Sequence, residues 1–573
     1  MSRLAIHIGG GEARDLLARL HPANEERFTL ERPDLSVAAT VPVLRDGENV
    51  LIVDGTPLPW PAGVPADWRA AARELRAHDG VFNLVFWDAA AGKLVICTDF
   101  LGLQPLYWSR DPHGLRLCSE TKAFQGEPDL AAWGAYLALG NTLGDRTLTA
   151  GVERLPAASV IVVDVRTRQV ETDRYWSLDT LGPPPGVDEV FEALDDSMDK
   201  AIAAARGEQV LLMSGGFDAR LIACLLKRKG QDFRALTVSH YDVNLDVDGR
   251  FARAFADKLG FDCAYVVPDG DFFSSRDYLE YLFASDAEIP SLYLFISQLA
   301  QFVPEGTTVW DGLLPDKALK HHGGRRGGFD AYFAESMHRW EGRTWQSARN
   351  VFGEVTARAM WEEFKDDLRE EIAGDSDDES GVQRFVLRNR GRNRVGPNPF
   401  KVFQRRAQPL TPGMTRAFFE TAMSVPGEQK LDYRLYFDLY RRFLPNALTL
   451  PFTAGGTGLV RSRWWSPHYH GWRVAINAHN FLQKRPRLMG KLGLDPGRHA
   501  FQRSRFLDAS VLAAEGDPFL CDDFVAALRR ADTVLAEELR LLFHWRTQRW
   551  LHDGTLYQRL LPEDAKQVSK AAA

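Results

Sequence analysis

The chain has 573 residues, of which 45% are hydrophobic and 26% are charged, as is ordinary for a globular protein of two or three domains. Its formal net charge of −7 argues against a dedicated nucleic-acid binder, which would carry a basic domain or stripe. No apolar run reaches the roughly 20 residues that span a bilayer and no signal peptide is recognisable, so we expect a cytoplasmic protein without membrane partners.

The first 180 residues alternate short apolar segments with Gly, Pro and Asp turns, a pattern typical of a layered, β-rich domain. Strands are predicted at 50–53, 81–87, 94–98, 115–119 and 159–165. Consecutive prolines at 183–185, flanked by Gly182 and Gly186, favour neither helix nor inner strand and mark a linker.

From about 188 to 322 the pattern changes to alternating helices and strands. The predicted elements are helix 189–205, strand 209–213, helix 219–229, strand 233–238, helix 248–259 and strand 263–267. Such alternation predicts a parallel sheet that binds a nucleotide at the carboxyl ends of its strands. The remainder is predicted to be mostly helical, with a solvated loop at the acidic run 375–379 and a solvated basic surface at Arg388, Arg390, Arg392 and Arg394.

The segment 208–222 constrains function most. An apolar run ending at Met213 predicts a buried strand, Ser214-Gly215-Gly216 breaks it, and a helix follows. A Gly turn at a helix start gathers free backbone N–H groups and suits a pyrophosphate. Asp218 would repel a phosphate unless a cation lies between them, so it predicts Mg²⁺. An ordinary strand–helix turn with two glycines is the alternative interpretation.

This segment resembles the Ser-Gly-Gly-x-Asp-Ser pyrophosphate loop of the asparagine synthetase family. Two further segments follow in the family's order: a short strand at 235–239 and a helix at 248–260 that is expected to be capped by Asp248 and ended by Gly260. A third, the strand and turn at 308–316, lies where the family has its second motif. There Asp316 falls on the Mg²⁺ aspartate.

The resemblance implies a PP-loop ATP pyrophosphatase domain (adenine nucleotide α-hydrolase-like). It implies ATP and Mg²⁺ as cofactors, with Asp218 and Asp316 as metal ligands. The residues expected to bind the nucleotide are Met213, Ser214, Gly215, Gly216, Asp218, Val238, Asp311 and Gly312.

The stretch 80–123 resembles the glutaminase (N-terminal nucleophile, Ntn) domain of the same family, through its "Asp-x-x-Gly-x-x-Pro-Leu-Tyr" and "Ser-Glu-x-Lys" segments. The similarity covers roughly residues 50–176. Glutaminases of the family use Cys at position 2, where this chain has Ser2. Asp54-Gly55 replaces the Asn-Gly that helps to hold glutamine. We therefore expect an inactive Ntn-hydrolase-like scaffold, as in the related β-lactam synthetases and lasso peptide cyclases.

Departures also occur in the second domain, where Ala219 replaces the last Ser of the loop and Leu313 and Leu314 alter the second motif. The family carries a lysine that stabilises the charge of the leaving group. Lys430 or Arg434 could serve as this catalytic cation here. A surface charge is the alternative for both.

The fold class expected is therefore α/β plus α+β, with an Ntn-like domain at 1–180, an ATP-binding domain at 187–470 and a helical extension at 471–573. The function expected is ATP-dependent adenylation of a small-molecule or peptide carboxylate, followed by amide formation with an amine other than glutamine-derived ammonia. The alternatives are a nucleotide-binding pseudoenzyme or scaffold and, if Ser2 is active, a glutamine-dependent asparagine synthetase. Self-association is left open.

Overall fold

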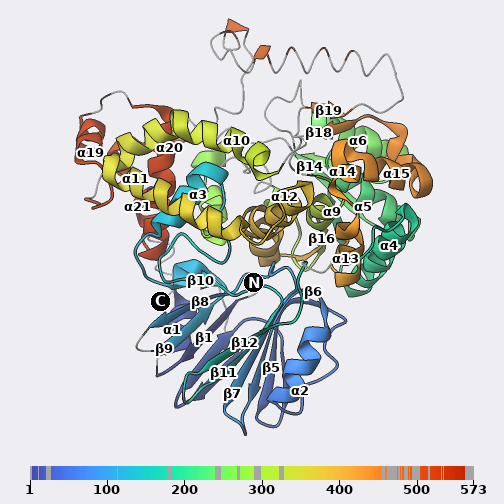
Figure 1. Cartoon of the computed structure of the whole chain (residues 1–573), viewed down its shortest axis with the longest axis horizontal. Helices are drawn as coiled ribbons and strands as arrows, with labels where there is room; N and C mark the ends of the chain where they lie inside the picture. Colours follow the sequence, from blue (N-terminus) through green and yellow to red (C-terminus); the bar gives the residue numbers. More distant parts are fainter. Residues whose placement is uncertain are drawn as a thin grey trace.

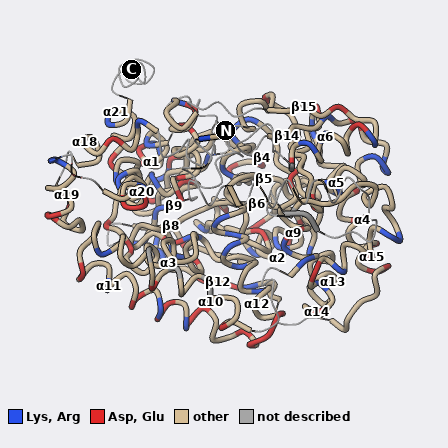
Figure 2. The backbone as a smooth tube through the Cα atoms, turned by 90° about the horizontal axis from the view of Figure 1, so that it is seen from above, with Lys and Arg blue, Asp and Glu red and all other residues tan. Residues whose placement is uncertain are grey.

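The computed structural model describes residues 3–10, 12–20, 28–111, 114–178, 182–238, 247–266, 272–288, 299–321, 328–454, 458–460, 504–513, 516–530 and 534–561, with a few single positions between them. Figure 1 shows a β-rich base below two predominantly helical lobes. Figure 2 shows Lys and Arg interspersed with Asp and Glu over this described part of the chain. Among the same residues, no helix has the length and apolar character needed to cross a membrane.

The β-rich base consists of two six-stranded antiparallel sheets. The first sheet has the order β10 (Glu153–Arg154), β8 (Tyr107–Asp111), β9 (Gly114–Cys118), β1 (Leu4–Ile8), β3 (Leu35–Ala39) and β2 (Phe28–Arg32). The second has the order β12 (Val170–Arg174), β11 (Ser159–Asp164), β7 (Lys93–Thr98), β6 (Asp79–Asp88), β5 (Asn49–Leu58) and β4 (Val43–Asp46).

Alternation along the strands builds four layers. On β5, Val50 and Ile52 join the cluster that also contains residues of β1 and β3, whereas Leu51 and Val53 join the cluster beneath helix α2 (Trp68–Glu74). Helix α1 (Ala13–Ala18) covers the outer face of the first sheet in the same way. The predicted layered β domain is therefore present. Strand β5 is longer than predicted, because it stays paired with β6 through Gly55 and Pro57.

The second part contains a parallel sheet with the strand order β15-β14-β13-β16-β17. Its strands are β13 (Gln209–Leu212), β14 (Arg234–Val238), β15 (Cys263–Val266), β16 (Thr308–Trp310) and β17 (Gln408–Leu410). Helices α4 (Val187–Ala204), α5 (Phe217–Arg228) and α6 (Val247–Leu259) alternate with the first strands. The bounds of α4, α5, α6 and β13 to β15 match the sequence-based expectations to within two residues, whereas β17 lies in a stretch that was predicted to be mostly helical.

The other helices form two groups around this frame. Those near the sheet are α9 (Leu313–Ala318), α12 (Glu379–Val386), α13 (Arg416–Ser424), α14 (Gly427–Lys430) and α15 (Arg434–Phe443). Those of the other lobe are α3 (Leu130–Leu139), α7 (Arg276–Ala284), α10 (Phe329–Arg339), α11 (Trp345–Ile372), α18 (Ala509–Leu512), α19 (Asp522–Arg529), α20 (Ala536–His552) and α21 (Leu556–Leu560). A two-stranded ribbon, β18 (Phe452–Ala454) and β19 (Gly458–Val460), completes the set.

The helical lobe draws on all three predicted segments of the chain. Trp133 of α3, Phe352 of α11 and Trp545 of α20 meet in one buried cluster, with ring centroids of Trp133 and Trp545 4.8 Å apart and those of Phe352 and Trp545 4.9 Å apart. Residues of the predicted extension 471–573 are therefore packed into a core that also holds a helix from the first 180 residues.

The predicted loop at the acidic run is present, with Ser376, Asp377 and Asp378 exposed, but the predicted solvation is wrong for Asp375 and Arg392. Arg388 pairs with Asp375, whose side chain is only 4% exposed. Arg392, in the π-helical segment Leu387–Val395, is buried and donates to the carbonyl oxygens of Gly102 and Leu155. The alternating charges in the sequence predicted a solvent-exposed surface. In the structure, arginine side chains instead donate hydrogen bonds to backbone carbonyls, and those of Arg392 join the helices to the β domain.

Candidate functional site

The loop after β13 forms as predicted between a strand and a helix. The Met213 N–H donates to Leu236 O at 2.8 Å and extends the ladder by one residue. Gly216 is the N-cap of α5, and no side chain caps this end of the helix. Because the first N–H groups of a helix have no intrahelical acceptor, the end of α5 presents donors and a positive dipole end. Such an end suits an anion.

Glycine is needed at position 215 because β18 and α6 lie too close to the loop for a side chain. A Cβ at this position would lie 2.8 Å from Thr453 Oγ1 and 3.0 Å from the Cβ of Phe251. The Gly215 N–H donates to Asp248 Oδ1 at 2.9 Å, and the Thr453 hydroxyl donates to the same oxygen. Asp248 is thus not the cap expected from the sequence: it lies in the first turn of α6, and its carboxylate accepts from the loop.

The second motif approaches the first at the carboxyl ends of β13 and β16. Gly312 lies so close to α5 that a Cβ there would be 2.6 Å from the Cβ of Asp218. Asp311 accepts the Leu313 N–H at 2.8 Å, and burial raises the pKa of Asp311 to about 6. The structure therefore gathers Asp218, Asp311, Gly312 and Asp316 at one point, where strand order reverses in the sheet.

Asp316 does not lie in a turn, as the sequence suggested, but in the helix α9. This places it four residues before Lys320 on the same face. Lys320 Nζ pairs with Asp316 and lies 3.7 Å from Asp218 Oδ2, so one ammonium bridges both predicted metal ligands. Lys317 also pairs with Asp316.

These contacts do not fit a protein-bound Mg²⁺ at the two aspartates. Mg²⁺ requires near-octahedral oxygen ligands, whereas here ammonium groups already neutralise both carboxylates. Within the described part of the chain, no three His, Cys, Asp or Glu side chains are arranged to hold a metal ion.

Aromatic residues of α15 and of the segments beside it contact Asp218 and the start of α5. The ring of Phe217 is stacked between those of Tyr433 and Phe452, at centroid distances of 4.2 and 4.0 Å. The Tyr436 hydroxyl donates to Asp218. Tyr433 has a positive φ of 60°, an uncommon conformation for a bulky residue that is frequent at functional sites.

The two predicted catalytic cations differ in their surroundings. Lys430 is fully buried and donates to Gln383 Oε1 at 3.1 Å. The Gln383 amide in turn donates to the backbone carbonyls of Lys317, Ala318 and Lys320, so Lys430 lies behind α9. Burial lowers the pKa of Lys430 to about 7. Arg434 is exposed at the start of α15. Their catalytic roles stay predictions.

Val238 ends β14 and is buried, and the residues that follow it, 239–246, lie outside the described part of the chain. Its expected contact with adenine therefore stays a prediction. Sequence reasoning missed Lys317, Lys320, Tyr433 and Tyr436. The lysines could have been found from their spacing to Asp316, but only if 313–318 had been recognised as a helix.

A small cavity lies beside the expected glutamine site. Ser2 lies outside the described residues, but Arg3 is buried and pairs with Glu120 at 2.8 Å. The adjoining cavity has a volume of about 20 Å³ and is lined by Arg3, Gln104, Lys401 and Gln404, among others. This volume holds roughly one water molecule. Side chains of both parts of the chain therefore line this cavity.

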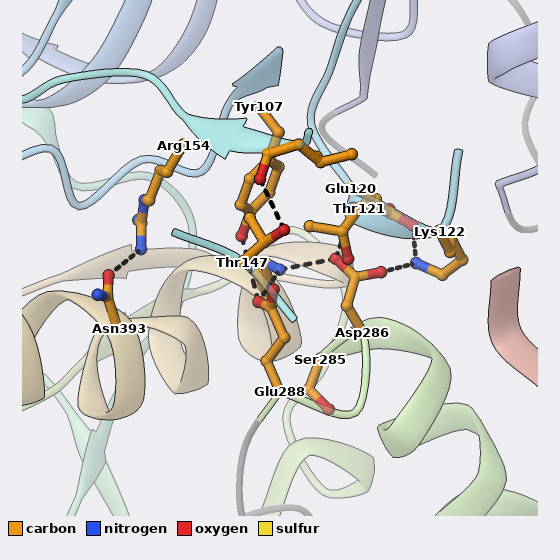
Figure 3. A network of polar contacts seen from close by, with 12 residues as sticks. Tyr107, Glu120, Thr121, Lys122, Thr147, Arg154, Ser285, Asp286, Glu288 and Asn393 are labelled. Carbon is orange, nitrogen blue, oxygen red and sulfur yellow. Dashed lines mark hydrogen bonds and ion pairs between the residues drawn. The ribbon is translucent and has the colours of Figure 1, made fainter. Parts of the chain in front are cut away.

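A buried ionic cluster joins the two parts at this point (Figure 3). Asp286, which follows α7, is fully buried, and its carboxylate lies 2.6 Å from Lys122 Nζ and 2.7 Å from Lys401 Nζ. Lys401 also pairs with Glu288, which accepts from the Tyr107 hydroxyl at 3.3 Å. Burial opposes ionisation of Asp286, yet the two lysines hold its pKa below the ordinary value. The Ser-Glu-x-Lys segment is thus an interdomain contact.

Comparison with known proteins agrees with parts of this architecture. Residues 68–176 match the family model of the glutamine amidotransferase domain. Asparagine synthetase [glutamine-hydrolyzing] 2 of Bacillus subtilis (strain 168) is 24% identical over 201 residues, which are 31% of this chain and 27% of the relative. The match thus spans well under two thirds of that protein.

Two solved structures were also matched. Glutamine phosphoribosylpyrophosphate amidotransferase from B. subtilis, complexed with ADP and GMP, is 10% identical with a TM-score of 0.20, covering 47% of this chain and 81% of that one. A structure described as the allosteric regulatory enzyme of purine biosynthesis is 8% identical with a TM-score of 0.19, covering 46% and 74%. At these TM-scores neither match carries an argument about this chain.

Proposed function

We propose that this chain is an asparagine synthetase-like, ATP-dependent ligase that forms an amide bond, a proposal supported by its similarity to the glutamine amidotransferase domain and to an asparagine synthetase. In the proposed reaction, an oxygen of a substrate carboxylate attacks the α-phosphorus of ATP, and pyrophosphate leaves. An amine then attacks the carbonyl carbon of the acyl adenylate, and AMP leaves as the amide forms.

The observation that carries this proposal is the convergence of the loop 213–216, the uncapped end of α5 and Asp218 at the switch point of a parallel sheet. An uncapped helix end beside a glycine turn is suited to a departing pyrophosphate. The neighbouring second motif, with Asp311, Gly312 and Asp316, supports the same assignment because it contacts α5 directly. ATP is the substrate that these features would accept.

The amine in the proposed reaction does not come from glutamine. The small cavity beside Arg3 supports this, since it has room for a water molecule but not for a glutamine side chain. The amine is then free ammonia, a second substrate, or an amine within the same molecule as the carboxylate. An intramolecular amine would give a cyclic product.

The test is isotope exchange between ATP and pyrophosphate, measured with the full chain over a panel of small-molecule and peptide carboxylates. Exchange that depends on one carboxylate supports the ligase. Asp218→Asn keeps the size of the side chain but removes its charge, and we expect it to reduce exchange by about 10²–10³-fold. Equal exchange rates in the two proteins would contradict the proposed site.

A nucleotide-binding scaffold is a second candidate, favoured by a specific observation. Lys320 bridges Asp218 and Asp316, and Asp248 occupies the Gly215 N–H, so groups expected to serve catalysis are engaged with one another. Nucleotide binding without exchange for every carboxylate would favour this function. Release of glutamate from glutamine would instead favour the glutamine-dependent synthetase.

A further inference from the structure

The point of interest is the ammonium of Lys320, which lies between the two carboxylates expected to bind a metal ion. Lys320 follows α9 directly, and its Nζ pairs with Asp316 and lies 3.7 Å from Asp218 Oδ2. The side chains of Lys320, Asp218 and Asp316 are each about one-fifth exposed, so the three groups face a partly open space. That space adjoins the uncapped end of α5.

The position of Lys320 is fixed by the backbone that carries it. Gln383 donates to the carbonyl oxygens of Lys317, Ala318 and Lys320 at 3.0, 3.3 and 3.3 Å. The Lys320 ammonium also lies 5.9 Å from the centroid of the Tyr433 ring, which is a favourable place for a cation. The end of α9 is therefore clamped, and its lysine is directed at the aspartates.

The charge balance favours the lysine over a divalent ion. Asp218 and Asp316 carry two negative charges, and Lys317 and Lys320 supply two positive ones. A divalent ion at the same carboxylates would have to displace one ammonium and lie beside the other.

We infer that Lys320 is the built-in cation of this site, in the place that a protein-bound divalent metal ion would take between Asp218 and Asp316. Two N–H groups of the ammonium face the carboxylates, and the third can donate to a phosphate oxygen at the end of α5. The part of this inference that concerns a nucleoside triphosphate rests on the proposed function. The displacement of the metal ion does not.

The first measurement therefore uses the metal alone. The full-length protein is titrated with Mn²⁺, and free Mn²⁺ is followed by electron paramagnetic resonance without nucleotide. We expect wild type to bind no Mn²⁺ at this site, and Lys320→Ala to gain one site because two carboxylates lose their cation. Lys320→Ala combined with Asp316→Asn should lose that site again. Lys200→Ala, which removes a surface lysine paired with Asp196, is the matched control.

The second measurement uses a fluorescent ATP analogue with Mg²⁺ or with EDTA. The affinity of wild type for the analogue in Mg²⁺ and its affinity in EDTA should differ by no more than about 3-fold, since the cation of this site is part of the chain. Lys320→Ala should bind at least about 10-fold more weakly in EDTA and recover when Mg²⁺ is added. Thermal melts check folding, and Lys320→Gln replaces the alanine variant if the latter does not fold.

The outcomes separate the two proposals. A wild-type protein that already binds one Mn²⁺, with no gain in Lys320→Ala, overturns the inference. So does an analogue affinity that depends on Mg²⁺ equally in both proteins, and the proposed ligase would then survive. If the analogue binds neither protein, the nucleotide site fails, while a gain of Mn²⁺ in Lys320→Ala still supports Lys320 as the occupant of the metal position.

Discussion

Lys430 shows how burial alone can move a titration into the neutral range. Its ammonium is fully buried, and it donates to Gln383, a neutral side chain, rather than to a carboxylate. Burial therefore lowers its pKa to about 7, well below the ordinary value for lysine. The folded protein releases this proton at a pH where the unfolded chain still holds it.

We expect the free energy of unfolding to rise with pH from this group. Below about pH 7 both states hold the proton, and between about 7 and 10 only the unfolded state does, so stability increases by about 1 kcal/mol per pH unit. Urea unfolding of wild type and Lys430→Met at pH 7, 8 and 9 measures the effect. The free energy of unfolding of wild type should therefore rise with pH relative to that of Lys430→Met.

The matched control is Lys200→Met, which removes an exposed lysine of α4. It should shift stability by a similar small amount at each pH. If wild type and Lys430→Met run parallel over the whole range, Lys430 does not titrate as its burial requires.

Asp316→Ala should destabilise the fold more than a substitution in a solvated turn would. The carboxylate pairs with Lys317, whose side chain is 4% exposed, and with Lys320, so its removal leaves a buried ammonium without its ionic partner. We expect a loss of about 1–3 kcal/mol in urea unfolding at neutral pH. Asp438→Ala, which breaks an exposed pair with Arg441, should change stability by less than about 0.5 kcal/mol.

At the scale of elements, helix α9 explains why sequence reasoning placed Asp316 correctly beside Asp218 but missed its partners. The order of the strands indicated that both aspartates follow carboxyl ends of the same sheet. The segment was predicted to be a turn, yet it forms a helix whose first turn contains Pro315, where the missing N–H is not needed. The helix brings Lys320 onto the face of Asp316, and a turn would not.

The elements themselves were predictable where periodicity was strong. Helices α4, α5 and α6 and strands β13 to β15 follow clear apolar patterns in the sequence, and their bounds agree with expectation. The polar contacts of Arg388 and Arg392 could not be predicted, because the sequence does not show whether the partner of a charged residue lies across a domain boundary. Only the fold brings Asp375 and the carbonyl of Gly102 to those guanidinium groups.

Contact between α9 and α5 can be tested at Gly312. A methyl group there would overlap the Cβ of Asp218 at 2.6 Å, so Gly312→Ala must push the start of α9 away from α5. We expect a loss of about 1–3 kcal/mol in stability and a fall in analogue binding. Gly374→Ala meets no atom within 4 Å and is the control, with little expected change in either measurement. Unchanged stability and binding in Gly312→Ala would contradict this close approach.

At the scale of the whole molecule, the two parts meet through charge as much as through apolar packing. Asp286 accepts from Lys122 of the first part and Lys401 of the second, at a position with a positive φ of 52°. Held in this conformation and fully buried, it has no route to solvent without opening the interface.

Asp286→Asn should therefore loosen the junction between the two parts. It leaves two buried ammonium groups without their shared anion, and we expect a loss of about 3–5 kcal/mol. Because the pKa of Asp286 is lowered by both lysines, wild type should also lose this contribution as pH falls below about 4, and the variant should not. Urea unfolding measures the loss of stability. The rate of limited proteolysis between residues 178 and 187 measures how far the junction has loosened. Asp173→Asn, on an exposed pair with Arg76, should leave both readouts unchanged.

Glutamine should not be hydrolysed by this protein. The cavity of about 20 Å³ beside Arg3 is lined by residues from both parts and has room for roughly one water molecule, so a glutamine side chain does not fit in it. Glutamate release from wild type should equal that of the protein-free blank. Release above the blank that disappears in Ser2→Ala would restore the glutamine-dependent alternative.

The order of strands in the parallel sheet has a consequence for synthesis of the chain on the ribosome. β17 lies at the edge beside β16, but everything between Trp310 and Gln408 must be made before it can pair. Until then β16 exposes an unpaired edge, and α3 lacks α11 and α20, against which it packs. Exposed strand edges and apolar helix faces invite association with other chains. The nascent protein should thus depend on chaperones over a long stretch of translation.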